Sequence, residues 1–150
     1  MPNPKPNENE KTKILIVDDN PELLEMYGNK FKKDDFLVYT ENNGLQALPA
    51  ANKIEPEIML VDIMMPNLNG FEVLNVIRKN STFNPIIIFF SNLSEDQYLK
   101  KGLGLEADHF IQKSNHTPSE VVAIVKKVME EKKGGKGAEN GGEYYDYPLI

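Results

Sequence analysis

Short, unbroken apolar runs recur along the chain, separated by longer stretches in which apolar residues are spaced three or four positions apart. An unbroken run of this kind predicts a strand buried on both faces, whereas the wider spacing predicts a helix with one buried face. Strands that alternate with helices predict a parallel sheet covered by helices on both sides, an α/β fold. The predicted strands are 14–17, 36–39, 57–61, 86–90 and 107–111.

Capping residues mark the starts of the helices. Asparagine followed by proline, or Ser or Thr with Gln or Glu three residues later, satisfies free backbone N–H groups at a helix start. These signals are Asn20–Pro21, Ser94–Gln97 and Thr117–Glu120. Pro49 falls within the second predicted helix, where it cannot donate to the carbonyl four residues earlier. We therefore expect Pro49 to interrupt this helix and leave it short or distorted.

The two ends of the chain differ from its centre in composition. Residues 1–11 are polar and rich in proline, which predicts a disordered N-terminal tail. Residues 134–150 begin with a glycine-rich linker and end in the aromatic segment EYYDYPLI. That segment is either an unstructured tail or a docking peptide for a partner. We expect the folded domain to span residues 12–133.

Length and charge narrow the class of protein. A chain of 150 residues suits one domain. The net charge of -6 and the pI near 5.0 argue against non-specific binding to nucleic acid or to an anionic membrane. Without cysteine there are no disulfides or zinc–thiolate sites. With no signal peptide or membrane-spanning run, we expect a cytoplasmic protein. We expect His109 and His116 to be exposed and to form no metal site.

Polar residues that could bind a ligand or take part in catalysis stand at the carboxyl ends of the predicted strands. In open α/β sheets, ligands bind outside these strand ends, where the strand order reverses. We therefore expect the residues to converge on one edge of the sheet. They are Asp18 and Asp19 at the first strand, Asp62 at the third, Ser91 at the fourth and Lys113 at the fifth.

Carboxylates gathered in this way need a cation. At about 4 Å and an effective dielectric near 20, each pair would repel by about 4 kcal/mol. Mg²⁺ relieves this repulsion, keeps several waters and leaves room for a phosphoryl oxygen. The Lys113 ammonium and the Ser91 hydroxyl would balance charge on that group. The residues predict phosphoryl transfer, with Asp62 as the nucleophile that forms an acyl phosphate.

The same residues resemble the receiver domain of two-component response regulators, over about residues 13–133. The motifs are the acid pair after ILIV, Asp62 in DIMMPNLNG, Ser91 after IIIFF and Lys113 in ADHFIQK. Each of them stands at a strand end, in the family's order. The resemblance implies a flavodoxin-like, doubly wound, five-stranded parallel sheet of order 2-1-3-4-5 with five helices.

The resemblance assigns roles around a phosphorylated aspartate. Asp62 accepts a phosphoryl group from a histidine kinase or a phosphotransfer protein. Asp19 and Asp62 bind Mg²⁺ directly, together with the main-chain carbonyl of Met64, and Asp18 acts through a metal-bound water. Lys113 contacts the phosphoryl group.

The resemblance also implies a switch. Ser91 contacts the phosphoryl group, and its shift lets the ring of Phe110 swing inward. The fourth helix and fifth strand then meet a downstream protein, which stays unknown. Nothing after the last helix is long enough for an output domain, so we expect a stand-alone receiver that signals by protein contact. We expect no enzyme activity beyond self-phosphorylation from small donors and self-dephosphorylation.

Two alternatives stay open. One is a degenerate receiver that only binds a partner protein, since Asn92 stands where a small residue is usual and Ser114 stands where proline usually follows Lys113. The other is a magnesium-dependent phosphohydrolase of the haloacid-dehalogenase type. That family needs its nucleophilic aspartate and a second aspartate two residues apart at the first strand, whereas Asp18 and Asp19 are adjacent.

Overall fold

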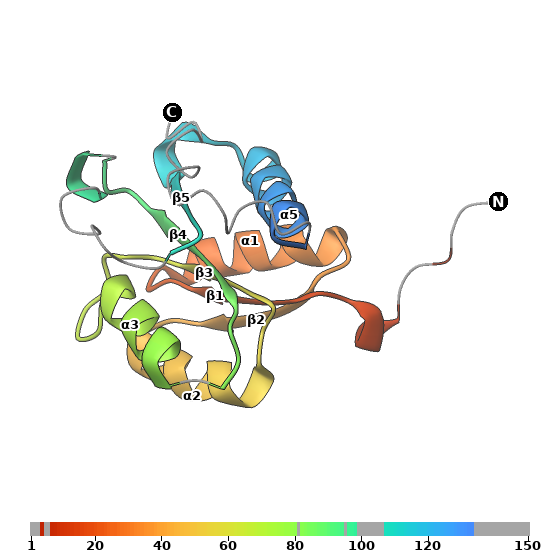
Figure 1. Ribbon diagram of the computed structural model, residues 1–150. Helices are drawn as coiled ribbons and strands as arrows, with labels where there is room; N and C mark the ends of the chain where they lie inside the picture. Colours follow the sequence, from red (N-terminus) through yellow and green to blue (C-terminus); the bar gives the residue numbers. More distant parts are fainter. Residues whose placement is uncertain (1–3, 5–6, 81, 95, 99–106, 134–150) are drawn as a thin grey trace.

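A parallel five-stranded sheet forms the centre of the computed structural model, which describes residues 4, 7–80, 82–94, 96–98 and 107–133. The strand order is β2-β1-β3-β4-β5 (Figure 1). The strands are β1 (Lys13–Val17), β2 (Leu37–Glu41), β3 (Ile58–Val61), β4 (Ile86–Ser91) and β5 (His109–Gln112). This is the doubly wound, flavodoxin-like sheet that the resemblance implies, so the predicted fold class is confirmed.

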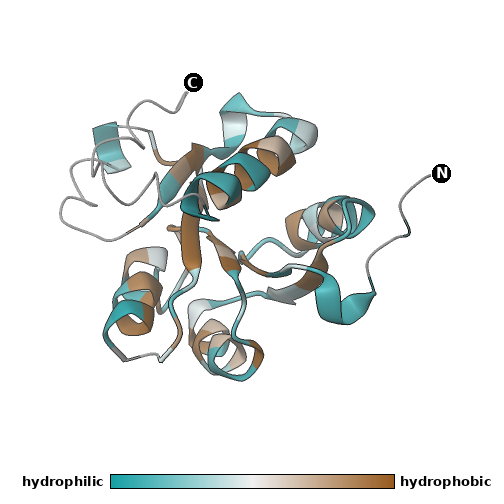
Figure 2. Cartoon of the chain, turned by 45° about the vertical axis from the view of Figure 1, so that its right-hand side comes forward, coloured by the Kyte–Doolittle hydropathy of each residue, from teal (hydrophilic) through white to brown (hydrophobic). Residues whose placement is uncertain are grey.

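Helices cover both faces of the sheet. On one face lie α1 (Pro21–Lys33) and α5 (Pro118–Lys133), and on the other lie α2 (Gly44–Ile54) and α3 (Gly70–Asn80). The apolar sides of these helices turn toward the strands (Figure 2). Because successive strand residues point to opposite faces, each strand contributes to both cores.

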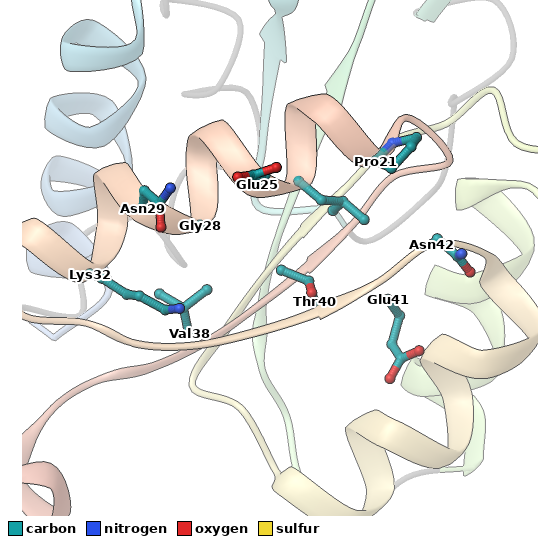
Figure 3. Close-up of a pocket in the computed structure, with 10 residues that line it drawn as sticks. Pro21, Glu25, Gly28, Asn29, Lys32, Val38, Thr40, Glu41 and Asn42 are labelled. Atoms are coloured by element: carbon teal, nitrogen blue, oxygen red, sulfur yellow. The ribbon is translucent and has the colours of Figure 1, made fainter.

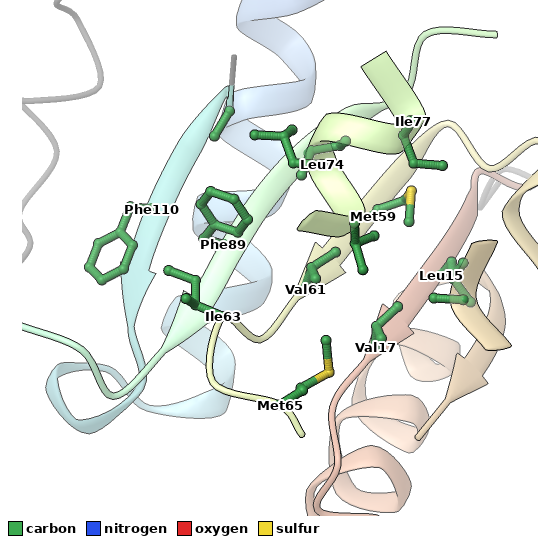
Figure 4. Close-up of a cluster of buried hydrophobic side chains, with 14 of the residues drawn as sticks. Leu15, Val17, Met59, Val61, Ile63, Met65, Leu74, Ile77, Phe89 and Phe110 are labelled. Atoms are coloured by element: carbon green, nitrogen blue, oxygen red, sulfur yellow. The ribbon is translucent and has the colours of Figure 1, made fainter. Parts of the chain in front are cut away.

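Two apolar clusters result, separated by the sheet. Leu15 and Val17 of β1 enter the cluster beneath α2 and α3, whereas Ile14 and Ile16 enter the cluster beneath α1 and α5. Figure 4 shows the first of these clusters, which also contains Phe110. The unbroken apolar runs of the sequence are therefore explained by burial on both sides.

The predicted helix starts are observed. The Asn20 side-chain oxygen accepts hydrogen bonds from the backbone N–H groups of Glu22 and Leu23 at 3.0 and 3.2 Å. The Ser94 hydroxyl accepts one from the backbone N–H of Gln97 at 3.2 Å. Helical structure follows this second cap, and the remainder of the predicted fourth helix lies outside the described residues.

α2 differs from its prediction, because Pro49 does not interrupt it. The helix continues through Pro49 and is 11 residues long. Proline removes one backbone donor, but Ala47 and Ala51 on either side of it are both 0% exposed. Their packing against the core holds the helix together across the missing hydrogen bond. The prediction of an interrupted, short helix is wrong.

His109 also differs, because it is buried rather than exposed. Its exposed fraction is 1%. Strand alternation places it on the same face of β5 as Ile111, which packs in the cluster beneath α1 and α5. Burial lowers the pKa of His109 to about 3, and the positive charges of His116 and Lys127 act in the same direction. The imidazole is therefore a neutral part of the core at physiological pH.

The ends of the chain are described only in part. Glu8–Glu10 form one turn of 3-10 helix without a buried residue, inside the tail predicted to be disordered. The predicted linker and aromatic tail, 134–150, lie outside the described residues. Within the part that is described, no helix has the length and apolar character needed to cross a membrane.

A groove of about 470 Å³ lies between α1 and the edge strand β2 (Figure 3). Gly28 of α1 lines this groove together with Val38 and Thr40 of β2. A Cβ atom added to Gly28 would meet both of these side chains at 3.9 Å, an ordinary contact distance. Asp18, Asp19 and Asp62 do not line the groove, which is therefore separate from the acidic edge of the sheet.

Candidate functional site

Three carboxylates meet at the carboxyl end of the sheet. Asp18, Asp19 and Asp62 each place one carboxylate oxygen within 4.8 Å of the others. The adjacent strands β1 and β3 bring them together. Val17 pairs with Val61, so the aspartates that follow these two residues leave the sheet at the same level. The backbone N–H of Asp62 donates to the Val17 carbonyl at 2.9 Å, which extends this pairing into the site.

Lys113 reaches the same carboxylates from the end of β5. Its ammonium donates to Asp18 Oδ2 at 2.6 Å and to Asp62 Oδ2 at 3.2 Å. The lysine side chain is 13% exposed, and those of Asp18 and Asp62 are 1% and 7% exposed. Buried carboxylates need a cation or hydrogen bonds to offset their desolvation. Lys113 supplies a positive charge and a hydrogen bond to each of the two carboxylates.

Backbone N–H groups hold the other oxygens of the same two carboxylates. The N–H of Asn20 donates to Asp18 Oδ1 at 2.9 Å, and the N–H of Met64 donates to Asp62 Oδ1 at 3.2 Å. Each carboxylate is thus fixed at one oxygen by its own loop and at the other by Lys113. Both are oriented before any ligand binds, which is the preorganisation that a reactive site requires.

Opposing effects act on the proton of Asp62. Burial raises the pKa of Asp62 above its usual range, and the Asp18 charge raises it further, whereas Lys113 and the N–H of Met64 lower it. The net direction is upward. The folded protein therefore holds this proton more tightly than the unfolded chain, so the ionised carboxylate reduces stability at neutral pH.

In metal-free buffer at pH 7, Asp62→Asn should raise the free energy of unfolding by about 1 kcal/mol, the scale of an ordinary substitution. Because the folded pKa of Asp62 is raised, its charge has no effect on stability below the unfolded pKa near 3.8. The gain should therefore vanish by about pH 3. Urea unfolding at both pH values measures this, with the exposed Asp19→Asn as the weaker control. A loss of stability at pH 7 would show that the Lys113 contact outweighs burial.

Glycine allows the loop after Asp62 to pack tightly. A Cβ atom on Gly70 would lie 2.5 Å from the Asp62 carbonyl oxygen and 2.8 Å from Ile63 Cα. The backbone N–H of Gly70 donates to the Ile63 carbonyl at 2.9 Å. Asn67, which lies between Ile63 and Gly70 in the chain, has a φ of 70°, a left-handed conformation that asparagine tolerates. The first turn of α3 therefore rests directly on the backbone of Asp62.

Lys113 reaches the acids without the proline that usually follows it in receivers. The peptide bonds of the described residues are all trans, including the bond between Lys113 and Ser114. The chain continues from there into a turn of 3-10 helix, η2 (Lys113–Asn115). The replacement by serine thus leaves the ammonium in contact with Asp18 and Asp62.

Ser91 and Phe110 lie inside the domain near the same edge. Ser91 ends β4 at 0% exposure, and its hydroxyl accepts a hydrogen bond from the backbone N–H of Leu93 at 3.4 Å. The Phe110 ring is 1% exposed and stacks on Tyr98, with ring centroids 4.4 Å apart and planes at 22°. Figure 4 shows it beside Phe89 in the core. The ring already lies inward, and its movement with Ser91 stays a prediction.

The acid cluster suits a hard divalent cation. Carboxylate oxygens are ligands that Mg²⁺ accepts, and three carboxylates lie within 4.8 Å of one another. Asp18 and Asp62 are buried, whereas Asp19 is exposed and opens the cluster to solvent. Met64, whose main-chain carbonyl the resemblance adds to the ligands, belongs to the loop after Asp62 and is 61% exposed.

Two further residues touch the site and carry no polar group that would mark them in a sequence. Gly70 packs on the Asp62 backbone, and its only signal is a glycine just before the apolar spacing of α3. The ring centroid of Phe90 lies 5.5 Å from Lys113 Nζ. Its signal is weaker still, because an apolar residue is expected at that position of a buried strand.

A doubly wound sheet with buried acids and a shared lysine at its switch point is the architecture of CheY-like receiver domains. Residues 14–126 match the family described as "Response regulator receiver domain", and the chain belongs to this family. The predicted assignment to two-component signalling is thereby confirmed, and receiver domains are signalling domains rather than conventional enzymes.

Solved structures share the fold. The chain superimposes on chemotaxis protein CheY4 of Vibrio cholerae with a TM-score of 0.72 at 23% identity, covering 79% of this chain and 98% of that chain. For the BeF3-activated N-terminal receiver domain of Klebsiella pneumoniae RstA the TM-score is 0.69 at 25% identity, covering 77% and 96%.

Curated relatives are longer proteins. The transcriptional regulatory protein CpxR homolog of Haemophilus influenzae is 37% identical over 118 residues, which are 79% of this chain and 50% of the relative. The alkaline phosphatase synthesis transcriptional regulatory protein PhoP of Bacillus subtilis is 32% identical over 119 residues, 78% of this chain and 48% of the relative. This chain thus spans about half the length of these regulators.

Proposed function

We propose that Asp62 accepts a phosphoryl group from a histidine kinase or a phosphotransfer protein, and that the conformational change that follows carries the signal. One observation supports this most strongly: Lys113 lies 2.6 Å from Asp18 and 3.2 Å from Asp62 at the edge where Asp19 completes an acid cluster. A phosphoryl acceptor needs a carboxylate, a metal site and a cation for the transferred group. Asp62, the acid cluster and Lys113 are the groups that would fill these three roles.

Asp19, Asp62 and the Met64 main-chain carbonyl would hold Mg²⁺ directly, with Asp18 acting through a water. When bound, the ion supplies charge neutralisation for the phosphoryl oxygens. Asp18 is buried and already oriented by the N–H of Asn20, so it can hold a water in a fixed place.

The chemistry of acceptance follows from the orientation of Asp62. One carboxylate oxygen attacks phosphorus in line with the departing group, forming a P–O bond as the donor's P–N bond breaks. The departing imidazole of the donor's phosphohistidine keeps the electron pair of the broken P–N bond and takes up a proton from solvent. Lys113 then pairs with a phosphoryl oxygen instead of a carboxylate, and the Ser91 hydroxyl donates to another. Movement of Ser91 would reach the stacked Phe110 ring through the packed core.

Intact-mass analysis after incubation with acetyl phosphate and Mg²⁺ tests the proposal. We expect a single phosphoryl adduct on the wild type, none on Asp62→Asn, and none on the wild type in excess chelator. No adduct on the wild type would instead favour the degenerate receiver, for which the replacements at Asn92 and Ser114 are the supporting observation. Hydrolysis of a phosphomonoester without a phosphoryl adduct on the protein would instead support the phosphohydrolase alternative.

Other predictions about the cell biology of the chain are separate from this test. The transcriptional role in the names of the relatives belongs to those longer proteins. The absence of nucleic-acid and membrane contact, the cytoplasmic location and action without an output domain all stay predictions.

A further inference from the structure

We propose that Phe90 is a positioning residue for Lys113, and that the face of its ring holds the ammonium at the acid cluster. This inference rests on the proposed function of Asp62. Lys113 Nζ lies 5.5 Å from the centroid of the Phe90 ring. A cation is attracted to the face of an aromatic ring within about 6 Å, and the attraction strengthens where water is excluded. The lysine side chain is only 13% exposed, so the contact is largely dry.

The Phe90 ring is itself held in place by Tyr27 of α1, which belongs to the same apolar cluster. Phe90 is 1% exposed and meets Tyr27 of α1 edge to face, with ring centroids 5.0 Å apart and planes at 78°. Such a contact favours one orientation of the ring plane. Tyr27 is 4% exposed, so neither ring has room to turn freely. A rigid aromatic pair therefore extends from α1 to the ammonium.

Lysine needs such a support because its side chain is long and flexible, and fixing it costs rotamer entropy. The other described contacts of the ammonium are with Asp18 and Asp62. Both of these carboxylates belong to the proposed metal site, so a metal ion would compete with Lys113 for them. The Phe90 ring carries no lone pair that a hard cation would take. It is the partner that Lys113 can keep while its carboxylate partners change.

Phe89 provides a matched control for a purely structural role. It adjoins Phe90 on β4, is 0% exposed, and points into the opposite core. Its ring contacts are with Phe71 and Tyr98, at centroid distances of 5.3 and 6.0 Å. Phe89→Leu and Phe90→Leu remove the same atoms from equally buried positions, but only the second removes a ring from beneath Lys113.

The experiment compares both variants with the wild type in the full chain. The first readout is the proton shift of the Lys113 ε-methylene group by NMR without metal, assigned by its loss in Lys113→Met. The Phe90 ring current should shift this signal away from that of an exposed lysine in the wild type and in Phe89→Leu, but not in Phe90→Leu. The second readout is the rate of adduct formation from acetyl phosphate at saturating Mg²⁺. Phe90→Leu should be about fivefold slower than Phe89→Leu, equivalent to a cation–π contact of about 1 kcal/mol.

An unperturbed lysine signal in the wild type, or equal signals and rates in the two variants, would overturn the proposal and leave Phe90 as ordinary core. Should the leucine variants fail to fold, Phe90→Met and Phe89→Met replace them, because methionine fills irregular space. If the wild type forms no adduct, the proposed function fails by itself. The NMR shift, which needs neither metal nor phosphoryl donor, then decides the role of Phe90.

Discussion

Replacing Lys113 with methionine should lower the free energy of unfolding of the metal-free protein by about 3–5 kcal/mol at pH 7, the loss typical of breaking a buried ion pair. The ammonium separates Asp18 and Asp62, whose side chains are 1% and 7% exposed. Methionine keeps most of the side-chain volume but leaves two buried carboxylates facing each other. Added Mg²⁺ should stabilise the variant more than the wild type, because the lysine no longer competes for the carboxylates.

Urea unfolding with and without Mg²⁺ measures both effects, and Lys126→Met is the matched control. Lys126 pairs with Asp34 at 3.1 Å, but the two side chains are 50% and 34% exposed. An exposed pair of this kind contributes about 0–1 kcal/mol. Equal losses in the two variants would show that Lys113 is an ordinary surface lysine, and that the acids are stabilised in another way.

Gly70→Ala should slow adduct formation on Asp62 by about 100-fold, the effect expected when a reacting group is displaced by about 1 Å. The new Cβ would lie 2.5 Å from the Asp62 carbonyl oxygen and 2.8 Å from Ile63 Cα. Both neighbours are backbone atoms, so the loop that carries the nucleophile has to move. The same overpacking should destabilise the protein by about 1–3 kcal/mol.

Gly28→Ala separates this effect from a general intolerance of alanine. In α1 the added Cβ would make contacts at 3.9 Å with Thr40 and Val38. A helical Gly→Ala change with adequate space stabilises by about 0.5–1 kcal/mol. Rates are measured by intact mass at a temperature where all three proteins are folded. A normal rate in Gly70→Ala would mean that α3, rather than the Asp62 loop, shifts to make room.

The main features of the fold follow from local signals in the sequence. Unbroken runs such as Ile58–Val61 need burial on both faces, which a parallel strand between two layers of helices supplies. Once these strands are parallel, Asp18, Asp62 and Lys113 must leave the sheet at the same edge. Their meeting is therefore predictable, although Asp18 lies 95 positions and Asp62 lies 51 positions before Lys113 in the chain.

Other features depend on packing that no local pattern reveals. Pro49 looks like a helix breaker, but the buried alanines around it keep α2 continuous. His109 looks like a surface residue, yet strand alternation turns it toward the same covered face of β5 as Ile111. The stacking of Phe110 on Tyr98 and the approach of Phe90 to Lys113 depend on which ring faces which neighbour. Composition and spacing do not contain that information.

The sharing of one ammonium by two carboxylates also sets an electroneutrality condition. Three formal negative charges at Asp18, Asp19 and Asp62 and one positive charge at Lys113 leave the pocket at minus two. A divalent ion cancels this remainder, a monovalent ion leaves half of it, and a trivalent ion overshoots. The charge that the pocket presents before a metal binds is therefore matched by one divalent ion such as Mg²⁺.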